Sequence, residues 1–303
     1  MINFEPLGLC HYKRLKPYFA NQHYQLSGYS LTSLIVWQQP KPYFAIRENT
    51  VIMYAESERH PEDKYLVLPV SVDGEFSPPM LYDLTQETGI PRYWFVPEDY
   101  LKRQSMAEID SLFHCEEQPL FEDYVYLASD LAELKGNKYS KKRNLINQFL
   151  RNHGDSGRVS VGTITPQNAE ECLAFLEKWC DEYALETPPD EDFMCEKEAV
   201  TNTIKNIDTF DVKSHVIGID GAVSAFGVCS HLNAETVVLN FEKAYSGVKG
   251  LYQYLDQECA KLIYKRYKYI NKESDMGIPG LTHAKKSYYP VKRIKSYRLT
   301  IKG

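Results

Sequence analysis

The sequence predicts an α/β protein with two domains, each built on a mixed, mostly antiparallel central sheet flanked by helices. The length of 303 residues suits two domains of ordinary size. Short apolar runs rich in β-branched and aromatic residues alternate with stretches of helical periodicity, which is typical of such domains. Two hairpin patterns, at residues 43–54 and 215–228, lie about 170 residues apart and indicate an internal repeat.

The composition excludes several classes of protein. An apolar fraction of 43% and a charged fraction of 25% are ordinary for a globular chain. No run of about 18 apolar residues predicts a transmembrane helix, and the first residues lack a signal-peptide pattern, so we expect a cytoplasmic protein. The seven cysteines form no CxxC pair, which argues against a disulfide framework, and no metal site is expected.

The charges are sorted along this acidic chain, whose net charge is −6. Two segments contain cations and no acids, one between residues 135 and 151 and one after Asp275. Their members are Lys135, Lys138, Lys141, Lys142, Arg143 and Arg151 in the first, and Lys285, Lys286, Lys292, Arg293, Lys295, Arg298 and Lys302 in the second. This sorting fits a surface that faces a polyanion, and it fits solvated helix and strand faces equally well.

The first half of the chain is expected to begin with a helix and a hairpin. The elements are a helix at 9–19, the hairpin with Glu48-Asn49 at its turn, a strand at 65–70 and a basic helix at 139–151. Turn-forming residues at 152–157 mark the best boundary. The predicted segments are a first domain at 1–134, a basic connecting helix at 135–154 and a second domain at 155–303.

The second half gives sharper signals. Its expected elements are a strand at 159–164, a helix from Thr165-Pro166, a helix at 195–206, the hairpin, strands at 236–241 and 267–271 around a helix at 251–266, a short helix at 281–288 and a closing strand at 296–301. Asp220-Gly221 between two apolar runs is a strong hairpin signal. Because hairpin, strand and helix follow in the order of the first half, we predict a duplicated fold, with chance similarity as the alternative.

The loop after the strand at 236–241 has the features of a phosphate-binding cradle. It contains Ser246, Gly247, Val248, Lys249 and Gly250. Free backbone N–H groups and the positive end of the next helix attract an anion, the glycines allow close approach, and Lys249 adds a cation. The element order around this loop resembles that of the GNAT N-acyltransferases, in which the loop grips the donor's pyrophosphate.

Several segments resemble the phosphatidylglycerol lysyltransferase C-terminal domain family. They are 135–144 with Phe149, 271–277, Gly280-Leu281, Ala284-Lys285 and 287–290. The resemblance implies two GNAT-like domains in tandem, as in the Fem aminoacyltransferases. It also implies transfer of an amino acid from aminoacyl-tRNA to an acceptor such as a lipid head group. The full lysyltransferases carry a membrane-spanning region ahead of this domain, and the sequence here contains no such segment.

Four residues are candidates for the transfer chemistry, in which the acceptor attacks the donor carbonyl directly. Glu242 ends its strand and could act as a base or bind an acceptor amine; the alternative is a surface carboxylate paired with Lys243. Glu273 and Asp275 follow the next strand, where open α/β sheets place ligands, and could bind a cationic amino acid or instead cap the following loop. Tyr288 could protonate the leaving group, or pack.

Cations from both basic segments are candidates for contacts with a nucleotide or a tRNA backbone. They are Lys138, Lys141, Lys142, Arg143, Lys285 and Lys286. If tRNA binds there, its affinity should fall steeply with salt.

Three functions follow from these patterns. The first is an aminoacyl-tRNA-dependent transferase acting on an amine or hydroxyl of a small molecule or a lipid head group. The second is an acyl-CoA-dependent N-acyltransferase, and the third is a non-catalytic domain pair that binds a ligand, RNA or protein. The donor is a co-substrate in both enzymes, so no tightly bound cofactor is expected. The first half has 71–75, with two carboxylates, in place of the glycine loop, so one donor site is expected.

Overall fold

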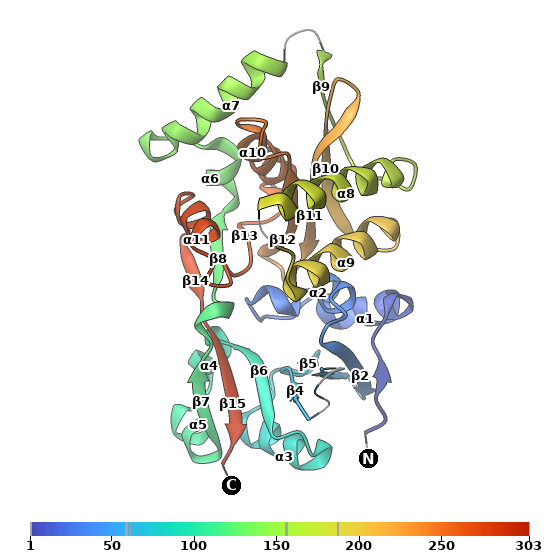
Figure 1. Ribbon diagram of the computed structural model, residues 1–303. Coiled ribbons are helices and arrows are strands. Elements are labelled where there is room, and N and C mark those ends of the chain that lie inside the picture. Colours follow the sequence, from blue (N-terminus) through green and yellow to red (C-terminus); the bar gives the residue numbers. More distant parts are fainter. Residues whose placement is uncertain (1, 58–59, 61, 155–156, 187, 303) are drawn as a thin grey trace. The chain divides into compact units, whose positions relative to one another are not determined.

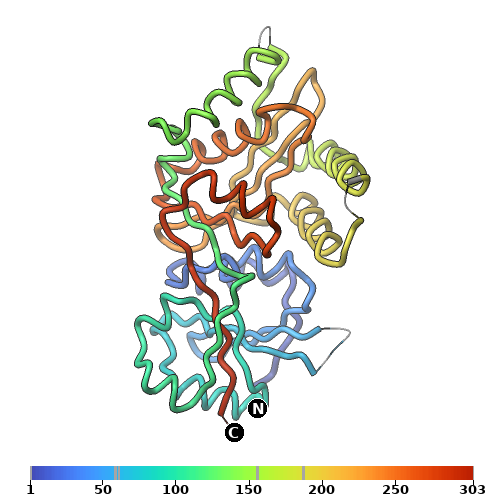
Figure 2. Tube along the Cα trace, turned by 60° about the vertical axis from the view of Figure 1, so that its left-hand side comes forward, coloured from blue at the N-terminus to red at the C-terminus, as the bar shows by residue number. Residues whose placement is uncertain are grey.

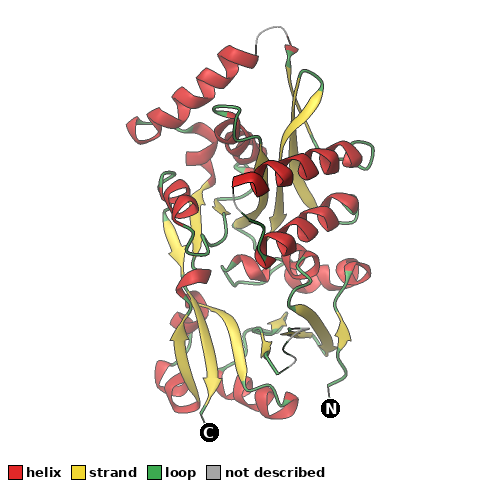
Figure 3. Ribbon diagram, in the orientation of Figure 1, coloured by secondary structure: helices red, strands yellow, loops and turns green. Residues whose placement is uncertain are grey.

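The computed structural model describes residues 2–57, 60, 62–154, 157–186 and 188–302. Contacts divide the chain into two units. The first contains residues 1–125, 232–234 and 271–303, and the second contains 126–231 and 235–270. Sheets of mostly antiparallel strands are flanked by helices in both (Figure 3). The predicted fold class, α/β with two mixed sheets covered by helices, is confirmed.

The first unit is built on a sheet with the order β1-β2-β3-β4-β6-β15-β7, with β5 paired to β3. Its elements are β1 (Glu5–Pro6), α1 (Tyr12–Phe19), α2 (Leu31–Val36), β2 (Lys41–Arg47), β3 (Thr50–Glu56), β4 (Lys64–Leu66), β5 (Val70–Ser71), α3 (Pro78–Thr88), β6 (Arg92–Pro97), α4 (Glu98–Arg103), α5 (Met106–Leu112), β7 (Phe113–Glu117), α11 (Pro279–Lys286), β14 (Lys292–Ile294) and β15 (Ser296–Ile301). Strands β4 and β6 are parallel. Strand β15 lies between β6 and β7 and pairs antiparallel with both, so the last strand of the chain completes this sheet.

The second unit contains strands in the order β13-β12-β11-β10-β9. Its elements are α6 (Ala128–Glu133), α7 (Ser140–His153), β9 (Val159–Gly162), α8 (Ala169–Glu186), α9 (Glu191–Lys205), β10 (Val212–Ile219), β11 (Ala222–His231), β12 (Thr236–Ala244), α10 (Leu251–Ile263) and β13 (Tyr269–Asn271), and β8 (Asp123–Leu127) runs into it from the first. Helix α8 packs on β11 and against α9, beside which it lies in Figure 1. Helix α10 contacts β10 to β12 and also α7, which runs beside it in Figure 2.

Both units repeat one succession of elements. In the first, the hairpin β2–β3 is followed by β4, α3 and β6, and in the second the hairpin β10–β11 is followed by β12, α10 and β13. The third strand pairs antiparallel with the hairpin in both units. The observed order therefore agrees with the predicted duplication.

Local signals explain why the hairpin of the second unit was predictable. Asp220 and Gly221 both have positive φ, 52° and 82°, which is the conformation that a two-residue hairpin loop requires. In the first unit the predicted strand at 65–70 is interrupted, because Pro69 has no N–H group to donate to a neighbouring strand.

The helix predicted from Thr165 begins later, at Ala169. The side chain of Asn168 accepts a hydrogen bond from the Thr165 N–H at 2.8 Å, and its carbonyl accepts one from the Cys172 N–H. A turn therefore precedes the helix, in which the Asn168 side chain satisfies the Thr165 N–H and the Asn168 N–H donates to the Thr165 carbonyl at 3.2 Å.

The two units differ from the predicted segments 1–134, 135–154 and 155–303. Residues 271–303 join the first unit because β15 pairs with β6 and β7, which lie far earlier in the chain. The basic helix α7 belongs to the second unit because it packs against α10. Two residues of the predicted boundary, Asp155 and Ser156, lie outside the described residues.

Candidate functional site

The predicted phosphate loop connects β12 to α10 in the second unit. Two backbone hydrogen bonds shape it, from the Val248 N–H to the Tyr245 carbonyl and from the Leu251 N–H to the Val248 carbonyl. Among the described residues, the N–H groups of the exposed Ser246, Gly247 and Lys249 have no hydrogen-bond acceptor. Three free donors and an exposed ammonium thus lie directly before the N-terminus of a thirteen-residue helix, an arrangement that favours an anion.

The two glycines of this loop have different structural roles. Gly250 has a φ of 88°, and a Cβ placed there would lie 2.2 Å from the carbonyl oxygen of Leu145 and 3.0 Å from Cβ of Phe149. The residue therefore allows α7 to approach the start of α10 closely. A Cβ on Gly247 would meet nothing within 4 Å. Gly247 is the loop position open to a ligand, and Gly250 is occupied by helix packing.

Glu242 lies near the end of β12, two residues before the strand stops. The negative charge of Glu242 helps to raise the pKa of Tyr252, which lies in the first turn of α10. The Tyr252 hydroxyl accepts a hydrogen bond from Trp179 Nε1 at 3.2 Å, and the same indole N–H also donates to the Ala244 carbonyl at 3.1 Å. Burial raises the pKa of Tyr252, the charges of Glu242 and Glu196 raise it further, and the hydrogen bond from Trp179 opposes them.

Lys243 is not the ion-pair partner of Glu242, because successive residues of a strand point to opposite faces of the sheet. Its ammonium lies 2.8 Å from Oε1 of Glu196 on α9 and 4.0 Å from the ring centroid of Trp179. The Lys243 side chain is 7% exposed. The alternative interpretation of Glu242 as a carboxylate paired with Lys243 is therefore wrong.

A second set of predicted residues comes together in the first unit, after β13. Lys285 of α11 directs its ammonium at three consecutive carbonyl oxygens, of Lys272 at 2.6 Å, Glu273 at 3.2 Å and Ser274 at 2.5 Å. An ammonium has three protons to donate, so this loop engages all of them. Burial lowers the pKa of Lys285, and the charges of Glu273 and Asp123 oppose that shift. A contact of Lys285 with nucleic acid, as predicted, would require these bonds to break.

Asp275 also contacts this loop, through both oxygens of its carboxylate. Its Oδ2 accepts a hydrogen bond from the Tyr124 hydroxyl at 2.6 Å, and its Oδ1 accepts one from the Gly277 N–H at 3.0 Å. Burial raises the pKa of Asp275, but the hydrogen bonds from Tyr124, Thr282 and the Gly277 N–H outweigh it and lower the value to about 2. The Gly277 bond is the loop-capping role that we named as the alternative to catalysis.

The low pKa of Asp275 makes the stability of the fold sensitive to acid. An unfolded aspartate titrates near pH 4, so between about pH 4 and pH 2 the unfolded chain binds a proton that the folded chain does not. The free energy of unfolding should therefore fall as the pH is lowered through this window. Urea midpoints between pH 5 and pH 2 should show a shallower fall in Asp275→Asn than in the wild type. The exposed Asp83→Asn on α3 should follow the wild type, and identical profiles for all three would contradict the assignment.

The remaining predicted residues each make contacts of their own or are exposed. Tyr288 is 9% exposed, and the Lys272 ammonium lies 5.0 Å from its ring centroid. Lys138 forms an ion pair with Asp130 at 3.0 Å. Arg143 donates to the Leu134 and Gly136 carbonyls, in the segment that follows α6. Lys141, Lys249 and Lys286 are exposed, and Lys142 is half-buried.

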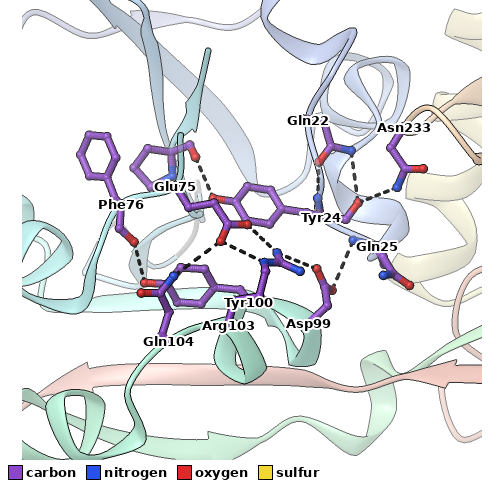
Figure 4. Close-up of polar contacts among 11 residues, drawn as sticks. Gln22, Tyr24, Gln25, Glu75, Phe76, Asp99, Tyr100, Arg103, Gln104 and Asn233 are labelled. Carbon is purple, nitrogen blue, oxygen red and sulfur yellow. Dashed lines mark hydrogen bonds and ion pairs between the residues drawn. The ribbon is translucent and has the colours of Figure 1, made fainter. Parts of the chain in front are cut away.

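The first unit has a polar network where its own loop precedes α3 (Figure 4). Glu75 receives two hydrogen bonds from the Arg103 guanidinium, at 3.0 Å and 2.5 Å, and Arg103 also contacts Asp99 at 3.0 Å. Burial raises the pKa of Asp99. The segment before α3 corresponds to the glycine loop of the second unit. It carries Glu75, and Arg103 binds both Glu75 and Asp99 of α4.

Tyr29 fills the gap between two strands of the first unit. β4 and β6 pair in parallel at Leu66 and Tyr93. Beyond that point the Tyr29 hydroxyl accepts a hydrogen bond from the Leu68 N–H and donates one to the Phe95 carbonyl, both at 3.1 Å. Tyr29 is 1% exposed, so its ring closes the space that these strands would otherwise open.

Comparison with known proteins identifies the family of this chain. The family described as phosphatidylglycerol lysyltransferase, C-terminal, matches residues 20–300. The chain belongs to this family. It is also similar over 100% of both chains, with 26% identity and a TM-score of 0.89, to a conserved protein of unknown function from Bacteroides thetaiotaomicron. No curated protein matches it.

One further solved structure shares the fold of this lysyltransferase-family chain, and another aligns less closely. The C-terminal domain (DUF2156) of a protein described as a lysylphosphatidylglycerol synthetase from Agrobacterium fabrum matches with a TM-score of 0.63 and 13% identity, covering 96% of this chain and 91% of that one. A tandem GNAT protein from the clavulanic acid biosynthesis pathway aligns with a TM-score of 0.47 and 8% identity, over 100% of this chain and 99% of that one. Membership of this family indicates a transferase.

The described part of the chain lacks two features. No helix there is long and apolar enough to cross a membrane. Within the same residues, no group of three or more His, Cys, Asp or Glu side chains is placed to hold a metal ion.

Sequence reasoning missed Tyr252, Trp179 and Tyr124. Helical periodicity places Trp179 on the apolar face of its helix, and periodicity does not show where an indole N–H points. Tyr252 follows the glycine loop directly, and that position was the available signal for it.

Proposed function

We propose that this protein transfers an amino acid from aminoacyl-tRNA to an amine or hydroxyl acceptor, with the donor's phosphates held at Ser246–Lys249. The observation that carries the proposal is the set of free N–H groups on Ser246, Gly247 and Lys249 before α10. Membership of the lysyltransferase family supports an aminoacyl donor, and a lipid head group is one acceptor that the family name suggests. An acyl-CoA donor is the second candidate, because it presents phosphate to the same loop.

In this reaction the acceptor's nucleophile attacks the carbonyl carbon of the aminoacyl ester. The ester C–O bond breaks, and the tRNA oxygen leaves with a proton. Glu242 accepts the proton of the nucleophile, and Tyr252, two residues into α10, supplies one to the leaving oxygen. Catalytic roles for Glu273, Asp275 and Tyr288 stay predictions. The loop around Asp275 is engaged in the contacts that fold it.

The degenerate loop of the first unit supports a single donor site. Glu75 and Asp99 place negative charge beside that loop, and Tyr29 fills the neighbouring gap between strands. A polyanionic donor would meet like charge there and free N–H groups in the second unit.

Gly247→Glu tests the donor loop. A carboxylate at this open position should repel the donor's phosphates and lower the transfer rate by about 100-fold, as the loss of one strong electrostatic contact does. The assay follows a labelled amino acid from charged tRNA to lipid and amine acceptors. Gly247→Ala, which adds no charge, should keep most of the activity.

Two outcomes would contradict the proposal. Equal transfer by Gly247→Glu and the wild type would remove the loop from the donor site. A thermal shift produced by CoA and not by a matched nucleotide, with no transfer from any charged tRNA, would identify the acyl-CoA enzyme instead.

A further inference from the structure

Three aromatic rings lie nearly parallel on the α8–α9 pair of the second unit. The ring centroids of Tyr183 and Phe193 are 4.9 Å apart with an interplanar angle of 8°. Trp179 lies 5.4 Å from Tyr183 at 19° and 6.2 Å from Phe193 at 16°. We call these three residues the aromatic face. Tyr183 is 37% exposed, so solvent reaches it.

The segment that forms α8 and α9, and so carries the aromatic face, is strongly acidic. Between residues 169 and 205 there are eleven acids, Glu170, Glu171, Glu177, Asp181, Glu182, Glu186, Asp190, Glu191, Asp192, Glu196 and Glu198, and three bases, Lys178, Lys197 and Lys205. This excess of eight negative charges is larger than the net charge of the whole chain, −6. Aromatic rings within such a field attract cations.

The chain's own Lys243 shows that the aromatic face stabilises an ammonium group. Its Nζ lies 4.0 Å from the ring centroid of Trp179 and 2.8 Å from Oε1 of Glu196. The Lys243 side chain is 7% exposed, and its ammonium has a ring face and a carboxylate as partners. Carboxylate and aromatic ring together are the chemistry that recognises ammonium ligands.

The aromatic face is fixed to the start of the donor loop. Trp179 Nε1 donates to the carbonyl of Ala244, the last residue of β12, and to the hydroxyl of Tyr252 in the first turn of α10. Tyr245, the next residue of the chain, packs edge-on against Phe175 of α8 with centroids 4.8 Å apart. A ligand on the aromatic face therefore lies beside the residues that enter the loop.

We propose that the aromatic face binds an ammonium group of the acceptor, on Tyr183 and Phe193. The inference rests on the proposed function, since it assigns the acceptor of the same transfer. A protonated amine has no lone pair for attack, so the bound ammonium is a second, non-reacting group. The substrate class is therefore an acceptor that carries one nucleophile and one separate ammonium, such as a diamine.

The test is titration calorimetry of the full chain with 1,4-diaminobutane in the absence of any donor. The diamine should bind, more weakly at high salt, and 1,4-butanediol should not. Tyr183→Leu keeps an apolar side chain but removes the ring, and it should weaken diamine binding about fivefold. Tyr183→Phe keeps the ring and should bind as the wild type does. Leu185→Ala, at an 88% exposed position of the same helix, should also change nothing.

Two results would overturn the assignment. Equal binding of diamine and diol, or none of either, would leave the aromatic face without a cationic ligand. Binding of AMP that depends on Tyr183 would make it a stacking surface for a base. Gly247→Glu separates this inference from the proposed function: it should lose transfer and keep the diamine affinity, because it changes the loop and not the aromatic face.

Discussion

Gly250→Ala is expected to lower the free energy of unfolding by about 3 kcal/mol. A Cβ at this position would lie 2.2 Å from the Leu145 carbonyl oxygen and 2.8 Å from its carbon. Both are backbone atoms of α7, so no side chain can rotate away, and α7 has to separate from α10. The φ of 88° adds strain for any residue other than glycine. Urea unfolding monitored by circular dichroism measures the loss.

Gly247→Ala is the matched control for this prediction. The two glycines are three residues apart in one loop, but a Cβ on Gly247 meets nothing within 4 Å. The control should lie within about 0.5 kcal/mol of the wild type, as surface substitutions usually do. Equal stability of both variants would show that α7 does not pack on Gly250 as described.

This contrast also decides which glycine can test the donor site. A charged substitution of Gly250 would remove donor binding by displacing α7, even if the loop never touched a phosphate. Substitution of Gly247 leaves the helix packing intact, so a loss of transfer there reports on the loop itself. The sequence alone gives no reason to prefer Gly247 or Gly250 as the position that contacts the donor. Their difference lies in the approach of α7, a segment about 100 residues earlier in the chain.

Local chemistry made most elements in the second half of the chain predictable. The Asp220-Gly221 turn, the strand–loop–helix unit and the strand at Ser296–Ile301 each depend on residues close together in the sequence. The pairing partners of that last strand lie far from it in the sequence. It pairs with β6 and β7 through antiparallel contacts that no local pattern encodes, and for that reason the units differ from the predicted segments.

The sequence predicted the residues of the candidate site better than it predicted their roles. Glu273, Asp275, Lys285 and Tyr288 were chosen as separate candidates, and the structure places the first three around one loop. Lys285 was assigned to nucleic acid because it belongs to a run of cations. A charge run gives no indication of burial, which depends here on carbonyls that the chain supplies eleven to thirteen residues earlier.

Lys285→Met should destabilise the fold by about 3 kcal/mol, because it removes the shared donor of a partly buried cluster. Methionine keeps the length of the side chain and lacks its protons. The carbonyls of Lys272, Glu273 and Ser274 would then lose their common donor, and each carbonyl left unsatisfied in this partly buried loop costs free energy of its own. The charges of Asp123 and Asp275 would also lose a neighbouring cation.

The adjacent Lys286→Met supplies the comparison, because Lys286 is exposed on the same helix. It removes the same charge from the chain and should change the unfolding free energy by no more than about 0.5 kcal/mol. A large loss in Lys285→Met with little change in Lys286→Met would show that the loop after β13 depends on one ammonium. If both variants unfold at the wild-type urea concentration, the Lys285 ammonium does not organise that loop. It would then be free to contact a polyanion, and a decrease of tRNA affinity in Lys285→Met would support the role first predicted for it.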